Sequence, residues 1–220
     1  MSIDVISLRK LMQLMLASDG RRTSLLRSNI TAELRRERNG PSDGGDFHSP
    51  FWADAKAHVG GAVNLREATP ARIRADGKRA RLYPLLTEGF LQWWEERRRR
   101  RNEPIQVTQA QIKGRVALEG LGVVKIENNL GFSIGDNGYR VIYPYFCEEP
   151  ELRNDVARVG LWAISQALPT YDLDDLRIID VLRSTSFSTS ECPFRGTEGD
   201  EFRAEYARLL ARWQELREEY

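Results

Sequence analysis

The chain has 220 residues and a formal net charge of +1 at pH 7, with 41% hydrophobic and 30% charged residues. This balance is typical of one large globular domain, or of one domain with an appendage, and it argues against a disordered chain. A membrane helix, a signal peptide and a disulfide framework are not expected, because no apolar run approaches about 18 residues and there are two cysteines, so we expect a cytoplasmic protein without a membrane partner.

The first part of the chain, residues 1–104, is predicted to be mainly helical. Apolar residues at helical spacing indicate a first helix over residues 2–16, with Ser2 as its N-cap, and a second over about 23–38. The second helix also has an arginine-rich face, which suits either a solvated surface or phosphate groups. Two further helices are expected at about 64–75 and 83–100.

The segment before the third of these helices holds both histidines of the chain, His48 and His58. Asp54 and His58 are four residues apart, so on a helix they share a face, and this spacing suits a pair of metal ligands. No third strong ligand follows at a recognisable interval, and Phe47 and Trp52 indicate an aromatic segment packed in the interior. We therefore assign no metal site here and leave open a role of either histidine beyond packing.

The strongest partner signal is a run of five arginines at the end of the 83–100 helix. Five consecutive residues cover every azimuth of a helix, so the neighbouring carboxylates can pair with only part of the run. Basic residues in a last turn interact favourably with the helix dipole, which gives a structural interpretation. The functional interpretation is a phosphate-binding cluster beside an aromatic residue that stacks on a base. The candidate nucleic-acid-binding residues are Arg97, Arg98, Arg99, Arg100, Arg101 and Trp94.

After Pro104 the pattern changes to short alternating runs rich in Val, Ile and Tyr, as strands require. Residues 105–220 are therefore predicted to form a small mixed sheet flanked by helices, which makes the whole chain an α+β fold and most simply one compact unit. The expected elements are a strand over 123–128, a hairpin turn at 135–138 and a strand over 139–146. A long helix follows, which we expect to begin at Pro150 and to be buried over about 156–168. A strand over 176–182 and an amphipathic C-terminal helix over 198–219 complete the chain.

Two stretches on either side of the hairpin turn carry a family resemblance. Lys125-Ile-Glu127 precedes the turn, and Tyr139-Arg-Val-Ile-Tyr-Pro-Tyr145 follows it. With the helix before them and the helix and strand after them, they give an order over about residues 80–185 that is similar to the core of the PD-(D/E)XK nuclease superfamily, particularly its RecB-like branch. The resemblance implies a nuclease-like scaffold in which Glu127 stands where the first acid lies and Glu88 stands for the acid of the preceding helix.

The same alignment implies that the chemistry is lost. Tyr143 and Tyr145 stand where such nucleases have a metal-binding acid and a catalytic lysine. These enzymes hold magnesium through clustered carboxylates, and a phenol replaces neither a carboxylate ligand nor a fixed positive charge. The resemblance thus implies an active-site remnant that consists of Glu88, Glu127, Tyr143 and Tyr145, without catalytic residues and without a cofactor.

The net charge of +1 conceals a gradient along the chain. Residues 66–101 carry 11 basic and 5 acidic side chains, whereas residues 147–220 carry 9 and 16. Such a gradient suits nucleic acid at the basic part and a protein partner at the acidic C-terminal third, and it equally suits two halves that attract one another within the fold.

We therefore expect a non-catalytic bacterial accessory or binding protein that contacts DNA or RNA, or a nucleoprotein complex, through the arginine cluster. One alternative is a divergent magnesium-dependent nuclease or phosphodiesterase that uses Glu88, Glu127, Asp136 and His48 or His58. Another is a purely protein-binding subunit that uses the acidic C-terminal third.

Overall fold

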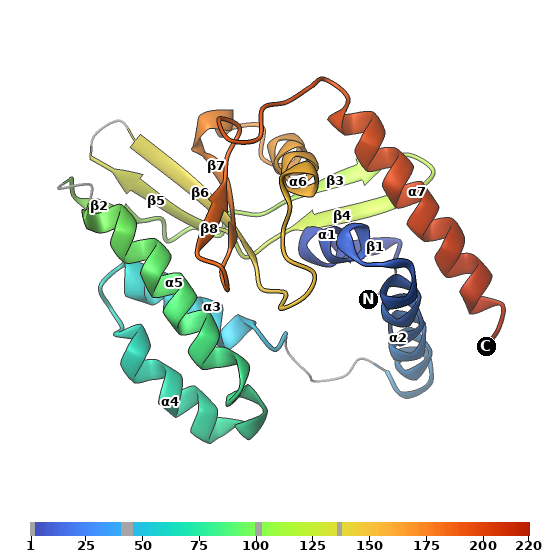
Figure 1. Cartoon of the computed structure of the whole chain (residues 1–220), viewed down its shortest axis with the longest axis horizontal. Helices are drawn as coiled ribbons and strands as arrows, with labels where there is room; N and C mark the ends of the chain where they lie inside the picture. Colours follow the sequence, from blue (N-terminus) through green and yellow to red (C-terminus); the bar gives the residue numbers. More distant parts are fainter. Residues whose placement is uncertain (1–2, 41–45, 100–102, 136–137) are drawn as a thin grey trace.

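The computed structural model describes residues 3–40, 46–99, 103–135 and 138–220. It is an α+β fold, as predicted (Figure 1). Its elements are, in chain order, β1 (Val5–Ser7), α1 (Leu8–Leu16), α2 (Asp19–Asn39), α3 (Ser49–Val59), α4 (Leu65–Ala75), the 3-10 helix η1 (Gly77–Arg79), α5 (Leu82–Arg99), β2 (Ile105–Val107), β3 (Gly114–Leu118), β4 (Gly122–Ile126), β5 (Leu130–Ile134), β6 (Gly138–Tyr145), α6 (Asn154–Ala167), η2 (Leu173–Asp175), β7 (Leu176–Asp180), β8 (Thr185–Phe187) and α7 (Glu198–Arg217).

The strands form two sheets rather than one. The first has the order β1-β4-β3 and the second the order β2-β5-β6-β7-β8. β5 and β6 form an antiparallel hairpin, and β7 pairs parallel to β6 after the α6 crossover. The strand predicted to lead into this hairpin, over 123–128, is instead β4 of the first sheet, so that part of the prediction is wrong. The chain passes from one sheet to the other between β4 and β5, where Asn128 has a φ of 65°. This left-handed conformation, which asparagine tolerates better than most residues, redirects the chain out of the first sheet.

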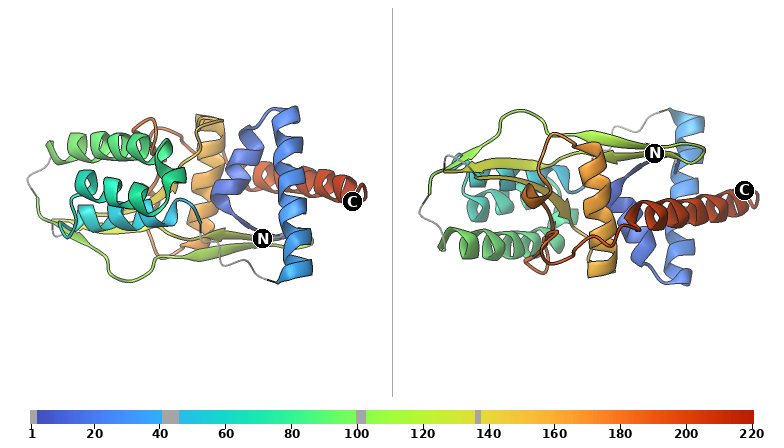
Figure 2. Two further views of the ribbon diagram at one scale, coloured as in Figure 1. Left: turned by 90° about the horizontal axis from the view of Figure 1, so that it is seen from below. Right: turned by 90° about the horizontal axis from the view of Figure 1, so that it is seen from above.

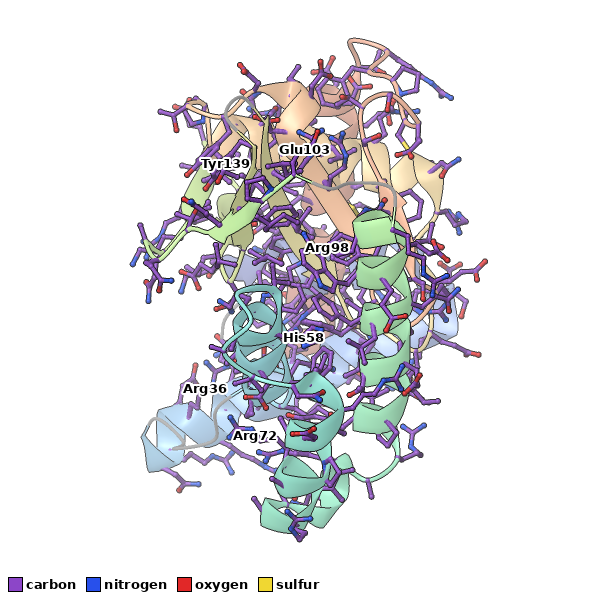
Figure 3. The ribbon with its side chains drawn as sticks, turned by 90° about the vertical axis from the view of Figure 1, so that its left-hand side faces the viewer. Arg36, His58, Arg72, Arg98, Glu103 and Tyr139 are labelled. Atoms are coloured by element: carbon purple, nitrogen blue, oxygen red, sulfur yellow. The ribbon has the colours of Figure 1, made fainter. Side chains whose placement is uncertain are left out.

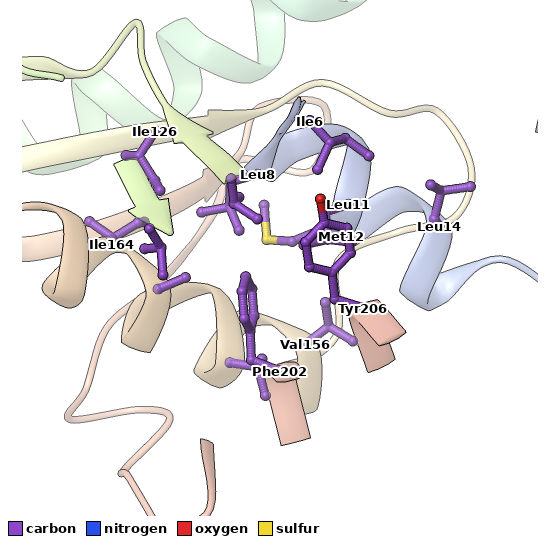
Figure 4. Packing of buried hydrophobic residues seen from close by; sticks show 14 of the residues in the cluster. Ile6, Leu8, Leu11, Met12, Leu14, Ile126, Val156, Ile164, Phe202 and Tyr206 are labelled. Carbon is purple, nitrogen blue, oxygen red and sulfur yellow. The ribbon is translucent and has the colours of Figure 1, made fainter. Parts of the chain in front are cut away.

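Two hydrophobic clusters hold the sheets and helices together. The first is mainly aliphatic and joins α1, α6 and α7 to β4, with Leu8, Leu11 and Met12 of α1 at its centre (Figure 4). The second is rich in aromatic rings and joins α3 and α5 to β5, β6 and β7. Both clusters draw residues from before and after position 104, so the helical N-terminal region and the sheet region share their interior.

The helices are distributed unequally around the sheets. α3, α4 and α5 lie at one end of the molecule, α2 and α7 lie at the other, and α6 crosses between them (Figure 2). α6 packs tightly against α1, since a Cβ atom on Gly160 would lie 2.8 Å from the Met12 sulfur. Among the described residues, no helix combines the length and the apolar character needed to cross a membrane.

The predicted first helix is wrong at its start. The structure has the short strand β1 before α1, and Ser7 is the N-cap of α1, accepting a hydrogen bond from the Lys10 amide, while the predicted cap Ser2 lies outside the described residues. β1 pairs parallel to β4, with Val5 opposite Val123, and this partner lies more than a hundred residues away in the chain. The apolar spacing of the segment fits a helix as well as a strand, so a long-range pairing decides the outcome.

Two predictions in the second half of the chain also need correction. Pro150 does not begin a helix, because α6 starts at Asn154. The segment between them is tied to the sheet instead: Tyr145 donates a hydrogen bond to the Pro150 carbonyl and Asp180 accepts one from the Leu152 amide. The strand that begins at Leu176 ends at Asp180, and the serine-rich stretch after it returns as the antiparallel strand β8.

Candidate functional site

A cleft of about 1350 Å³ opens between α1 and α3. Its floor comes from the ends of β4 and β6, where the second sheet leaves a space: β5 pairs with β6 only as far as Ile142, opposite Leu130. Beyond Ile142 this edge of β6 has no strand beside it within the sheet, and Pro144, which has no amide hydrogen to offer, lines the cleft there. The cleft is therefore a direct result of the split between the sheets.

One wall of the cleft is the face of α3 that carries His48, Trp52 and Lys56. These residues are spaced by four, and because an α-helix has about 3.6 residues per turn they lie in one stripe. Trp52 is buried, and its indole nitrogen donates a hydrogen bond to the Asn128 carbonyl on the floor. This bond fixes the wall against the floor and leaves His48 and Lys56 on either side of it.

The other wall is α1, whose first turn presents Ser7, Arg9 and Lys10 to the cleft. The Arg9 amide donates a hydrogen bond of 2.8 Å to the Tyr143 hydroxyl on the floor. The Arg9 guanidinium crosses the cleft to Asp46 at 2.6 Å and lies 5.4 Å from the centre of the Phe146 ring. Arg9 therefore joins the α1 wall, the floor and the start of the α3 wall.

Asp46 and His48 form a dyad on the same side. The His48 Nδ1 atom lies 3.3 Å from Asp46 Oδ1, and the imidazole stacks on Phe146 with ring centroids 4.9 Å apart and an interplanar angle of 5°. Burial opposes the ionisation of Asp46, but the hydrogen bonds from His48 and the charge of Arg9 outweigh it and hold the pKa of this carboxyl well below its usual range. Asp46 and Phe146 thus fix the His48 ring, and Asp46 occupies its Nδ1 edge.

Positive charge outweighs negative charge in the cleft, since six of its lining residues are Lys or Arg and four are Asp or Glu. Three of the five lysines of the chain are among them: Lys10, Lys56 and Lys78. Burial lowers the pKa of Lys10 and of Lys56, and Glu33 offsets part of the effect on Lys10. Within the described part of the chain, neither ammonium group has a hydrogen bond or a salt bridge.

The rim after β6 is held by side chains from β7 and the turn that follows it. Arg183 donates hydrogen bonds to the carbonyls of Cys147 and Glu148, and it also pairs with the buried Asp180 at 3.3 Å. Burial raises the pKa of the Cys147 thiol to about 11, so it is a neutral group at neutral pH. Because the thiolate is the nucleophilic form of cysteine, we assign Cys147 no nucleophilic role.

The structure divides the four residues of the expected active-site remnant. Glu127 and Tyr143 both line the cleft, and burial raises the pKa of Tyr143 well above its usual range, with Asp46 and Glu127 adding to the effect. Tyr145 is fully buried and bonds to the Pro150 carbonyl. Glu88 lies outside the cleft, on the exposed side of α5, where it pairs with Arg66 at 2.5 Å.

The arginine run lies far from the cleft. The cleft reaches α5 at Leu82, and Arg99 ends this helix of 18 residues, so about 25 Å separates them along its axis. Arg97 lies over the Trp93 ring at 4.6 Å and donates hydrogen bonds to the Trp93 carbonyl and to Ser186. Arg97 therefore has a structural role at the junction of α5 and β8.

The remaining members of the run are placed differently. Arg98 is exposed, and Arg99 pairs with Glu95 at 3.5 Å, whereas Arg100 and Arg101 lie outside the described residues. Trp94 is only 7% exposed and packs edge-on against Phe132, so the prediction that it is available to stack on a base needs correction. A residue in this position belongs to the aromatic core, because helix α5 turns it toward the sheet.

The other predicted candidates are also engaged elsewhere. Asp54 makes two hydrogen bonds of 2.8 Å to Arg72, and His58 lies between α3 and α4, where its Nδ1 atom is 3.1 Å from the Val63 carbonyl (Figure 3). Asp136 lies outside the described residues. In the part of the chain that the structure describes, His, Cys, Asp and Glu side chains do not gather in threes as a metal ion would require.

Comparison with known proteins gives no relative for this chain. Neither a family model, nor a curated protein, nor a solved structure matches it.

The charge gradient of the sequence is partly neutralised within the fold. Arg27 of α2 pairs with Glu219 at 2.7 Å, and Arg217 of α7 pairs with Glu33 and Glu37 of α2. Only the Arg27–Glu219 pair joins a basic residue of the first part of the chain to an acidic residue of the last third, whereas both Arg217 pairs have the opposite polarity, so the α2–α7 contact accounts for only a small part of the gradient. Figure 3 also shows Arg36 of α2 and Arg98 of α5 well apart, so these two arginines do not belong to one surface.

Sequence reasoning missed Arg9, Lys10, Asp46 and Lys56. One signal for the α3 wall was present: His48, Trp52 and Lys56 follow at intervals of four and place a base, a ring and a cation on one helix face. The α1 wall had no comparable signal, because its position depends on the β1–β4 pairing that the sequence did not reveal.

Proposed function

We propose that the protein binds single-stranded nucleic acid in the cleft between α1 and α3. The observation that carries this proposal is the presence of Lys10 and Lys56 in one cleft, partly buried and, among the described residues, with ammonium groups that make no salt bridge or hydrogen bond, although Glu33 is near enough to Lys10 to offset part of the cost of its burial. Burying a charged group without a partner is costly, and an anion between the walls offsets that cost. The nucleic-acid phosphate is the anion that suits a groove with several cations along it.

The arrangement of the other charges supports a strand rather than a small anion. Arg21 and Lys78 also line the cleft and are exposed, so the cations of the cleft include both partly buried lysines and groups open to solvent. Arg9 and Arg81 are already paired with Asp46 and Glu148. A strand that follows the cations meets Lys10 and Lys56 on the inside and Arg21 and Lys78 at the rim.

We keep the nuclease-like scaffold as a proposal for the origin of the cleft. Glu127 and Tyr143, which the resemblance to PD-(D/E)XK nucleases singles out, both line it, and Glu88 does not. The proposed function is binding by an accessory protein, with the contact moved from the arginine run of α5 to the cleft.

Binding of a labelled single strand over a series of salt concentrations, followed by fluorescence anisotropy, tests the proposal. We compare the wild type with a Lys10→Gln/Lys56→Gln variant. We expect the variant to bind about tenfold to a hundredfold more weakly, since a hydrogen bond to a charged group contributes about 1.5–3 kcal/mol. The slope of log affinity against log salt should fall by about 1.4, because each phosphate neutralised on a single strand contributes about 0.7.

An Arg98→Gln/Arg99→Gln variant is the matched control. It removes the same charge from the other end of α5 and should change the affinity by less than about threefold, because exposed charges at a distance are screened. An equal loss in both variants, or a loss only in the control, would show that the strand binds at the arginine run. An affinity that does not fall with salt would rule out the nucleic-acid proposal.

A further inference from the structure

The floor and walls of the cleft bring together groups that binding alone does not require. Asp46 and His48 form a dyad on the α3 side, Glu127 directly follows β4, and Tyr143 lies near both carboxylates, since Asp46 and Glu127 each raise its pKa. Arg9 joins Tyr143 to Asp46 through its amide and its guanidinium. These five residues form a connected cluster in the same cleft as the inner lysines.

From this cluster we infer that the cleft cleaves RNA by acid–base catalysis, with Glu127 as the base, His48 as the acid and the lysines as phosphate-binding groups. The inference rests on the proposed function, because the strand must first bind in the cleft. The reaction class follows from the groups present: a carboxylate and an imidazole can move two protons, and ammonium groups can stabilise the charge that develops on a phosphate.

The chemistry balances without a further reactant. The ribose 2′-hydroxyl oxygen attacks the adjacent phosphorus, and its proton passes to the Glu127 carboxylate. The bond from phosphorus to the 5′-oxygen of the next nucleotide breaks, and that oxygen takes a proton from His48 Nε2. The products carry a 2′,3′-cyclic phosphate and a 5′-hydroxyl group, and proton exchange with water restores Glu127 and His48.

The geometry assigns the supporting roles. Asp46 lies against Nδ1 of His48 and leaves Nε2 as the edge that exchanges a proton, and Phe146 fixes the plane of the ring by stacking. Asp46 and Phe146 are therefore positioning residues. Lys10 and Lys56 lie on opposite walls and suit the two sides of a phosphate that gains charge as the hydroxyl attacks.

The requirement for a 2′-hydroxyl gives the test. RNA, DNA of the same sequence and fully 2′-O-methylated RNA are incubated with the full-length protein in EDTA, and the products are analysed by gel electrophoresis and mass spectrometry. We expect cleavage of RNA alone, with 2′,3′-cyclic phosphate ends. Products with a 5′-phosphate, or cleavage that EDTA abolishes, would overturn the inference.

Two variants locate the chemistry. His48→Gln and Glu127→Gln should each slow cleavage about a hundredfold or more, since a general acid or base contributes about 10²–10⁴-fold. Both should bind 2′-O-methylated RNA within about threefold of the wild type, and circular dichroism checks their fold. The Arg98→Gln/Arg99→Gln variant, purified in the same way, should cleave like the wild type and so controls for a contaminating ribonuclease.

The outcomes separate the two proposals. Binding of 2′-O-methylated RNA without cleavage of RNA would overturn the catalytic inference and leave the binding function intact. The absence of binding to any strand would overturn the binding function, and the catalytic inference with it. Undiminished cleavage by the His48→Gln variant would also overturn the inference, because the activity would then come from elsewhere.

Discussion

The cleft and the far end of α5 are both rich in positive charge, but the two regions use it differently. At the end of α5, Arg97 stacks on Trp93 and Arg99 pairs with Glu95, so these charges are satisfied within the protein or lie in open solvent. In the cleft, Lys10 and Lys56 come from helices far apart in the chain and make no salt bridge among the described residues, and only Lys10 has an acidic group, Glu33, near enough to act on its pKa.

The difference shows which property marks a binding surface. Five arginines in a row are conspicuous in a sequence, yet consecutive residues of a helix point in different directions and cannot all face one ligand. Single cations contributed by separate elements can face the same phosphate when the fold brings those elements together. The concave arrangement of charge, rather than its density along the chain, therefore favours the cleft.

The largest effect should come from Trp94, which separates the two interpretations of α5. Trp94→Ala should lower the free energy of unfolding by about 3–5 kcal/mol, because it empties a position in the aromatic core. Urea unfolding followed by circular dichroism measures the loss. The milder Trp94→Phe variant should fold and bind single strands like the wild type; a clear loss of affinity in this variant would restore Trp94 as a base-stacking residue.

Arg97 gives the next largest effect, again on stability. Arg97→Ala should cost about 1–2 kcal/mol of unfolding free energy, since it removes the contact with Trp93 and the hydrogen bond to Ser186. Thermal unfolding measures this, and anisotropy should show an unchanged affinity. A stable variant that has lost nucleic-acid binding would instead place the binding surface at the end of α5.

Asp46→Asn should change two properties of the cleft in opposite directions: it should strengthen nucleic-acid binding and slow RNA cleavage. The change removes a negative charge and releases Arg9 from its salt bridge, so the affinity for 2′-O-methylated RNA should rise about threefold to tenfold, or ~1 kcal/mol. RNA cleavage should fall, because His48 loses the carboxylate that orients it. Weaker binding would contradict the proposed path of the strand, and unchanged cleavage would remove the positioning role.

The smallest expected effect is a dependence of stability and of nucleic-acid affinity on pH, caused by Lys10 and Lys56. Burial lowers their pKa in the folded state below the usual 10.5, so the unfolded chain binds more protons between the two values. Stability should therefore rise with pH in this window, whereas affinity for nucleic acid should fall because the ammonium groups lose their protons. The Lys10→Gln/Lys56→Gln variant should lack both trends, and an affinity that is flat up to pH 10.5 would exclude the lysines from the contact.

Much of the fold was predictable because it follows from local patterns. The predicted helix that ends at about residue 75 and the final amphipathic helix agree with α4 and α7, and the strand predicted after the turn, over 139–146, agrees with β6, whereas β5 was not predicted and residues 136–137 of the turn lie outside the described residues. Each has a cap, a turn or an apolar stripe that lies within a few residues of the element itself. The α+β class followed from the change in pattern after Pro104.

The candidate site was not predictable in the same way. Glu127 and Tyr143 were found through the family resemblance, but Lys10 and Lys56 face the same cleft only because β1 pairs with β4 and because Trp52 bonds to Asn128. Such contacts join residues that are distant in the chain, and periodicity within a segment carries no information about them. The buried position of Trp94 likewise depends on which side of α5 meets the sheet.

The anchoring of β1 has a consequence for how the protein is made. The Ile3 carbonyl accepts a hydrogen bond of 2.6 Å from Tyr206 of α7, and the Asp4 carbonyl accepts one of 2.7 Å from the Val123 amide. Because β1 is synthesised more than a hundred residues before its partner β4, and the Ile3 carbonyl 203 residues before Tyr206, the wall of the cleft that α1 provides is secured only after both partners have been made. A nascent chain therefore emerges without a finished cleft, and the proposed binding site forms only after α7 has been synthesised.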